Sequence, residues 1–135
     1  RYEIPLLIYS PQYFKTAAID SHTVSHCDIM PTVLSLAGCK HKFFTFGANV
    51  LDTNNHYAIN YANGILQLLQ YPYCLELLPN NQASMHDQAK DLPIKQARYI
   101  LTEPEKVLRL KMEQQLKARY QTYINSLIDN RFFGD

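Results

Sequence analysis

Apolar residues near the start of the chain form a continuous run, not an alternating pattern. Residues 4–9 read Ile-Pro-Leu-Leu-Ile-Tyr, and Ser10-Pro11 ends the run. A short run of this kind is typical of a strand that is buried on both faces of a parallel sheet. The chain contains no second run like it, so we expect a fragment of a larger α/β domain. An isolated fragment should then self-associate through the apolar surface of this strand.

The spacing of apolar residues becomes helical after Asp28. They recur three and four positions apart, which predicts a short helix over residues 28–38. Asp28 is suited to cap the first turn, and Pro31 falls where no intrahelical hydrogen bond is lost. Gly38 stands where a left-handed residue ends a helix. Each of these local signals supports the same short helix.

Two segments with strand character flank the pair Asn63-Gly64. Residues 57–61 and 65–69 are rich in aliphatic and aromatic side chains, and Asn-Gly is the preferred two-residue hairpin turn. A turn at Tyr71-Pro72 leads into a third segment with strand character, residues 73–78. We therefore predict a three-stranded antiparallel meander.

The last third of the chain is predicted to be a polar loop followed by a long helix. Residues 79–97 are polar and read as a surface loop, and residues 103–130 have helical periodicity. Thr102-Glu103-Pro104-Glu105 has the pattern of a capping box. The apolar stripe of this helix consists of Leu108, Met112, Leu116, Tyr120, Tyr123 and Leu127. The predicted units are the C-terminal part of an α/β domain (1–80), a linker or surface loop (81–101) and a packing helix (102–135).

Composition adds few constraints. The 135 residues are 47% hydrophobic and 19% charged, with a net charge of +1. These values are typical of a globular chain, and the charge argues against nucleic acid as a partner. The three cysteines, Cys27, Cys39 and Cys74, fit neither a disulfide framework nor a CxxC metal site, and we interpret them as small buried side chains.

Residues 25–38 read Ser-His-Cys-Asp-Ile-Met-Pro-Thr-Val-Leu-Ser-Leu-Ala-Gly. This order resembles a signature of the alkaline-phosphatase/sulfatase superfamily: Ser, Gln or His, any residue, Asp, an aliphatic residue, any residue, Pro-Thr, two aliphatic residues and a later Gly. Residues 4–11 are similar to the strand before that signature, and residues 44–51 (Phe-Thr-Phe-Gly-Ala-Asn-Val-Leu) to the segment after it. The resemblance covers residues 1–80 and, more loosely, the rest. The closest subgroup is that of the lipoteichoic acid synthase-like enzymes, including the Gram-negative phosphoglycerol transferases.

The resemblance implies an enzymatic parent protein. Enzymes of this superfamily act outside the cytoplasmic membrane, in the periplasm or on the outer face of the inner membrane, usually anchored by N-terminal transmembrane helices. They hydrolyse or transfer phosphate or sulfate esters with a nucleophile bound to a divalent metal (manganese, zinc, magnesium or calcium). The nucleophile and metal ligands lie before the segment that resembles residues 4–11, so neither catalytic residues nor metal ligands are expected here. The implied partners are the N-terminal part of the parent domain and a phospholipid, phosphoglycerol or sulfate-ester substrate.

The signature residues divide into one substrate-lining candidate and four structural ones. His26 precedes the helix, near the sheet edge where α/β sites form, so it could line the substrate or make a structural hydrogen bond. Asp28, Pro31, Thr32 and Gly38 are interpreted as structural: a cap, a first-turn residue, a packing residue and a helix end.

Two other functions stay open at this point. Zinc-ligand residues crowd both ends of the short helix, which would suit a small zinc-binding module. They are His22, His26, Cys27, Cys39 and His41. An independent binding module is the other alternative, in which Tyr61, Tyr71 and Tyr73 stack on a carbohydrate or glycerophosphate; these side chains could equally pack the meander against the helix.

Overall fold

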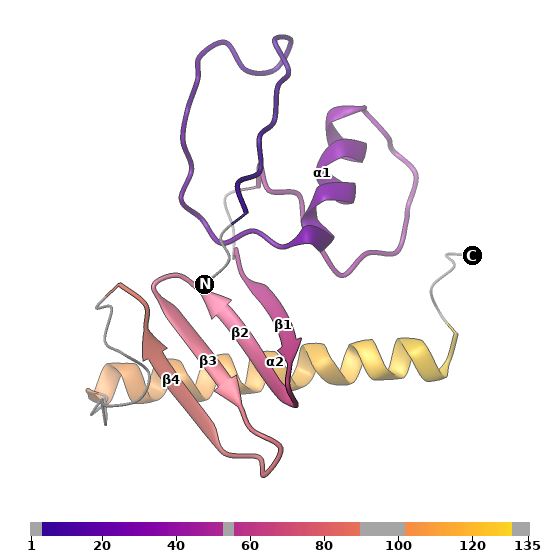
Figure 1. Cartoon of the computed structure of the whole chain (residues 1–135). Helices are drawn as coiled ribbons and strands as arrows, with labels where there is room; N and C mark the ends of the chain where they lie inside the picture. Colours follow the sequence, from indigo (N-terminus) through magenta and orange to yellow (C-terminus); the bar gives the residue numbers. More distant parts are fainter. Residues whose placement is uncertain (1–3, 53–55, 90–101, 131–135) are drawn as a thin grey trace.

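The computed structural model describes residues 4–52, 56–89 and 102–130 and combines helices with one antiparallel sheet. Figure 1 shows a helical unit and long loops above the sheet, with the long helix crossing behind it. The elements, in chain order, are η1 (His26–Asp28, a 3-10 helix), α1 (Ile29–Leu36), β1 (Ala58–Ala62), β2 (Ile65–Gln70), β3 (Tyr73–Leu77), β4 (Ala83–Asp87) and α2 (Glu103–Ile128).

The sheet is a meander of strand order β1-β2-β3-β4 in which every neighbouring pair is antiparallel. The predicted hairpin is confirmed: Asn63 and Gly64 join β1 to β2 with φ values of 53° and 79°. Positive φ at both central residues is what a type I′ turn requires. This turn also sets the register, because Ala62 pairs with Ile65 directly beside it.

The prediction of a loop over residues 79–97 is wrong at Ala83–Asp87, which forms β4. The strand was missed because it carries a single large apolar residue, Met85, which pairs with Leu75 of β3 and is 4% exposed. Asn81, with φ of 63°, makes the turn between the two strands. Residues 90–101 of the predicted linker lie outside the described residues.

The core lies between one face of the sheet and the first half of α2. It contains Leu66, Leu68, Leu75, Met85, Met112 and Leu116. The capping box is present, since the Glu105 carboxylate accepts hydrogen bonds from the backbone N–H (2.8 Å) and the hydroxyl (2.7 Å) of Thr102. The predicted apolar stripe is buried only in part, because Tyr120, Tyr123 and Leu127 are each more than 40% exposed.

The short helix is confirmed as η1 followed by α1. Its C-terminus is a Schellman motif: the N–H of Cys39 donates to the carbonyl of Leu34 (2.9 Å), and that of Gly38 to the carbonyl of Ser35 (3.0 Å). Gly38 has φ of 71°, the left-handed conformation expected of it.

The predicted N-terminal strand is not formed. Residues 4–10 belong to no strand, and Ile4, Leu7 and Tyr9 are 71%, 90% and 86% exposed. A strand needs neighbours to take up its backbone hydrogen bonds, and the four strands of this sheet pair only with one another. Self-association through this segment stays a prediction.

Candidate functional site

Asp28 connects the start of the helical segment to the loop that follows α1. One carboxylate oxygen accepts a hydrogen bond from the backbone N–H of Ser25, and the other from that of Ala48, both at 2.7 Å. The carboxylate makes no capping bond to α1, so the predicted cap is wrong in detail. Asp28 instead completes a capping box with Ser25 around η1 and holds a residue twenty positions away.

Thr32 makes a second connection between the same segments. Its hydroxyl donates to the carbonyl of Asp28 (2.6 Å) and accepts from the N–H of Val50 (3.0 Å). The residue is only 2% exposed. A buried hydroxyl with these two partners satisfies a loop N–H that would otherwise lose its hydrogen bond, which gives Thr32 a structural role.

Gly47 brings the loop into direct contact with η1. A Cβ atom at this position would lie 2.0 Å from the carbonyl oxygen and 2.3 Å from the carbonyl carbon of Cys27. Only glycine allows the two backbones to approach so closely. We call residues 25–50, joined by Asp28, Thr32 and Gly47, the signature unit.

The remaining signature residues differ in exposure. Pro31 is buried in the first turn of α1. His26 is exposed on η1, and its ring makes no hydrogen bond with any described residue, so the structural alternative for it gains no support. Cys27 and Cys39 are exposed as well, and only Cys74 is buried as the sequence predicted for all three.

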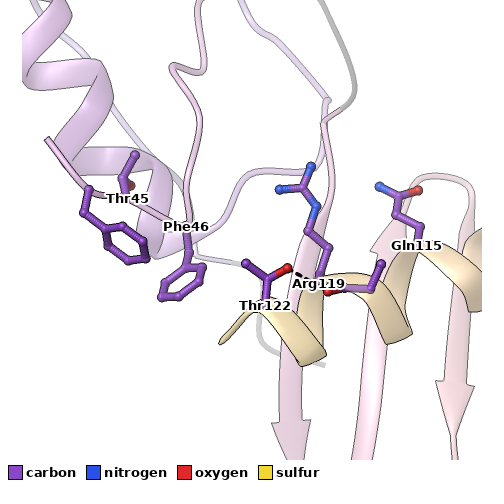
Figure 2. Close-up of a pocket in the computed structure, with 7 residues that line it drawn as sticks. Thr45, Phe46, Gln115, Arg119 and Thr122 are labelled. Atoms are coloured by element: carbon purple, nitrogen blue, oxygen red, sulfur yellow. Dashed lines mark hydrogen bonds between the residues drawn. The ribbon is translucent and has the colours of Figure 1, made fainter. Parts of the chain in front are cut away.

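A pocket of about 300 Å³ lies between the signature unit and α2. Its lining consists of Phe44, Thr45, Phe46, Gln115, Ala118, Arg119 and Thr122. Figure 2 shows Thr45 and Phe46 on one side and Gln115, Arg119 and Thr122 projecting from α2 on the other. The described lining residues supply one cation, two hydroxyls and an amide, which together can hold a polar or anionic group.

Arg119 also links this pocket to the sheet. Its guanidinium lies 4.9 Å from the centroid of the Tyr57 ring, within the range of a cation–π contact. Burial raises the pKa of Tyr57, Arg119 opposes that shift, and the negative charge of Asp28 adds to it. Sequence reasoning missed Arg119, because in the sequence it is one of many charges on a solvated helix.

A row of polar side chains crosses the sheet on the face opposite α2. The Asn60 amide donates to Gln67 (3.1 Å), and the Gln67 amide donates to Glu76 (2.8 Å). At the far end, Nε2 of His86 lies 3.4 Å from Glu76 and 3.3 Å from the hydroxyl of Ser84. In a Ser-His-Glu triad the acid and the serine contact different nitrogens of the histidine ring. Here Glu76 and Ser84 both contact Nε2 of His86, so these three residues do not have the geometry of a triad.

The zinc alternative receives no support from the described part of the chain, where no three histidine, cysteine or acidic side chains gather into a metal site. His22 contacts the Asp20 carboxylate and packs against the His56 ring, with centroids 4.7 Å apart. A backbone hydrogen bond from His22 is the main cause that lowers the pKa of Asp20. These contacts form a small surface cluster.

The tyrosines proposed as a stacking platform do not lie together. Tyr61 pairs with Leu66 near one end of the β1–β2 hairpin, whereas Tyr71 follows β2 at its other end. Tyr73 packs against the core.

The chain matches no protein-family model, no curated protein and no solved structure. Within the described residues, no helix has both the length and the apolar character needed to cross a membrane.

Proposed function

We propose that this chain is the C-terminal scaffold segment of a metal-dependent, extracytoplasmic enzyme of the alkaline-phosphatase/sulfatase superfamily, closest to the lipoteichoic acid synthase-like phosphoglycerol transferases. The observation that carries the proposal is the structural role of the motif positions. Asp28, Thr32 and Gly47 join two segments through hydrogen bonds and a close backbone approach, and Gly38 ends the helix between them. These roles explain why the pattern needs these residue types in this order.

The fold supports the same proposal. The hairpin around Asn63-Gly64 and a terminal helix rich in Lys, Glu and Gln also match the superfamily pattern, and the chain has both. Residues 4–9 expose an apolar surface that neighbouring strands of a larger sheet could cover. In the proposed parent, the N-terminal part of the domain supplies those strands.

The chemistry belongs to that N-terminal part under this proposal. It would contribute the nucleophile and the ligands of a divalent metal, which makes the nucleophile more acidic and neutralises charge on the transferred group. Thr32 is unsuited as a nucleophile because its hydroxyl is buried between two backbone partners. His26 is the one residue of this chain that we propose to line the substrate, since its ring is exposed.

The test is to tag the gene that encodes this sequence in its source organism and to purify the tagged polypeptide from the extracytoplasmic membrane fraction. We expect a product larger than 15.7 kDa that hydrolyses 4-nitrophenyl phosphate or sulfate, or releases glycerol phosphate from phosphatidylglycerol. Chelation should lower the rate by orders of magnitude, and manganese or zinc should restore it. A cytoplasmic product of 15.7 kDa without such activity would refute the proposal.

A further inference from the structure

The two edges of the sheet differ in how well they are protected against pairing with another strand. The outer strand β4 has a buried central residue, Met85, and carries His86 and Asp87. The other outer strand, β1, has the sequence Ala-Ile-Asn-Tyr-Ala, with no charged residue and no proline, and four of its five residues are exposed. Natural edge strands usually carry such protecting residues, so an uncharged, exposed edge is suited to pair with a further strand.

The turn determines which backbone groups of β1 face outward. In a two-residue hairpin the closing pair, here Ala62 and Ile65, exchanges both hydrogen bonds. Because hydrogen-bonded and non-bonded positions alternate, Ala58 and Asn60 also direct their backbone groups toward β2. The N–H and C=O groups of Ile59 and Tyr61 therefore point away from the sheet.

We propose that a second copy of this chain pairs with β1, antiparallel and centred on Asn60, to give a continuous eight-stranded sheet. A twofold axis at Asn60 places Ile59 of each copy opposite Tyr61 of the other copy. Each of these pairs brings together the outward backbone groups of both strands, and a β-branched residue opposite an aromatic one is a favourable cross-strand pair. Ile59 and Tyr61 are 36% and 67% exposed in the single chain.

The polar row on the opposite face is complementary to itself at the same axis. The Asn60 amide uses one N–H to reach Gln67, and among the described residues nothing donates to its carbonyl oxygen. Two facing Asn60 side chains can each donate their second N–H to the carbonyl oxygen of the other. The row of Glu76, Gln67 and Asn60 would then run without interruption across both copies, as in stacked amide ladders.

The length of α2 agrees with a wider sheet. A helix of 26 residues is roughly 39 Å long, whereas four strands occupy roughly 19 Å. Its main contacts with the sheet are to β2, β3 and β4, and in Figure 1 its second half extends beyond β1. That half carries the exposed part of the apolar stripe, including Tyr120 and Leu127. Phe46 of the signature unit already packs against Tyr123 in this half, with ring centroids 5.3 Å apart, so a sheet that continues from β1 would extend beside the signature unit, over Tyr120 and Leu127.

Charge substitutions at Asn60, read out by sedimentation velocity of the full chain from micromolar to millimolar concentration, test the proposal. The unchanged chain should reach twice 15.7 kDa. Asn60→Lys and Asn60→Glu should each sediment as monomers, because like charges then face each other at the axis. An equimolar mixture of the two should recover the dimer, which also shows that both variants are folded.

Two control variants distinguish this edge from other surfaces. Ser84→Lys places the same charge on β4, on the same face of the sheet, and should leave the dimer intact. Leu7→Glu disrupts the separate association expected of the exposed N-terminal segment and should leave the β1 dimer intact. A chain that stays monomeric throughout, or a dimer that survives Asn60→Lys but is lost with Leu7→Glu or Ser84→Lys, would overturn the assignment to β1. The outcome does not depend on the enzymatic activity of the parent.

Discussion

Replacing Gly47 by alanine should destabilise the signature unit by about 3 kcal/mol, the upper end of what overpacking costs. The added Cβ would lie 2.0 Å from the carbonyl oxygen of Cys27, and a backbone atom cannot rotate away as a side chain can. The loop would have to move outward, which would break the hydrogen bonds from Ala48 to Asp28 and from Val50 to Thr32.

Amide hydrogen exchange is the appropriate measurement, because it detects local opening of one part of a protein separately from global unfolding. The amides of Ala48 and Val50 should lose their protection in Gly47→Ala, while those of β2 and β3 keep theirs. Gly38→Ala is the matched control. Its added Cβ atom would meet no other atom within 4 Å. The variant should therefore lose only the stability that a left-handed conformation costs a residue other than glycine, about 1 kcal/mol. Equal protection of Ala48 in the two variants would show that the close approach of Gly47 is unimportant.

Truncating Leu116 to alanine should lower the free energy of unfolding by about 3 kcal/mol, within the range for fully buried leucines. Leu116 is 0% exposed and belongs to the core cluster in which α2 covers the sheet. Deletion of its side chain leaves a cavity between the two layers. In a domain of this size such a loss is a large part of the total stability.

The control for this prediction is Leu110→Ala, the same substitution on the same helix at a residue that is 52% exposed. We expect it to change stability by less than about 1 kcal/mol. Urea denaturation followed by circular dichroism measures both variants. Similar losses in the two would mean that α2 does not cover the sheet as described.

The sequence predicted those elements whose signals are local. The Asn63-Gly64 turn, Gly38 at the helix end and the capping box of Thr102 and Glu105 need only their neighbours to act, and all three are present. Strand β4 has no such signal, because only its pairing with β3, in which Met85 lies opposite Leu75, makes it a strand. The run at residues 4–9 fails in the opposite way, since its pattern is that of a strand but the described chain offers it no partner.

The residues of the candidate site also divide into those with a local sequence signal and those that depend on contacts distant in the sequence. The structural role of Thr32 was predicted from its position inside a helix, but its bond to Val50 joins residues eighteen positions apart and no local pattern indicates it. The same holds for the bond from Ala48 to Asp28. For Asp28 the sequence suggested only a role as a helix cap. Arg119 and the pocket beside it depend on how α2 lies against residues 44–46, a tertiary contact without a motif.

The measurement that tests the central claim most directly is the metal content of the purified, untagged chain, determined by plasma mass spectrometry before and after dialysis against a chelator. A scaffold segment whose metal ligands lie elsewhere in the parent should hold no stoichiometric metal, and its fold by circular dichroism should be unchanged by the chelator. One tightly held zinc per chain, lost together with the helical signal on chelation, would contradict the account. It would assign His22, His26, Cys39 and His41 to a metal site of the chain's own.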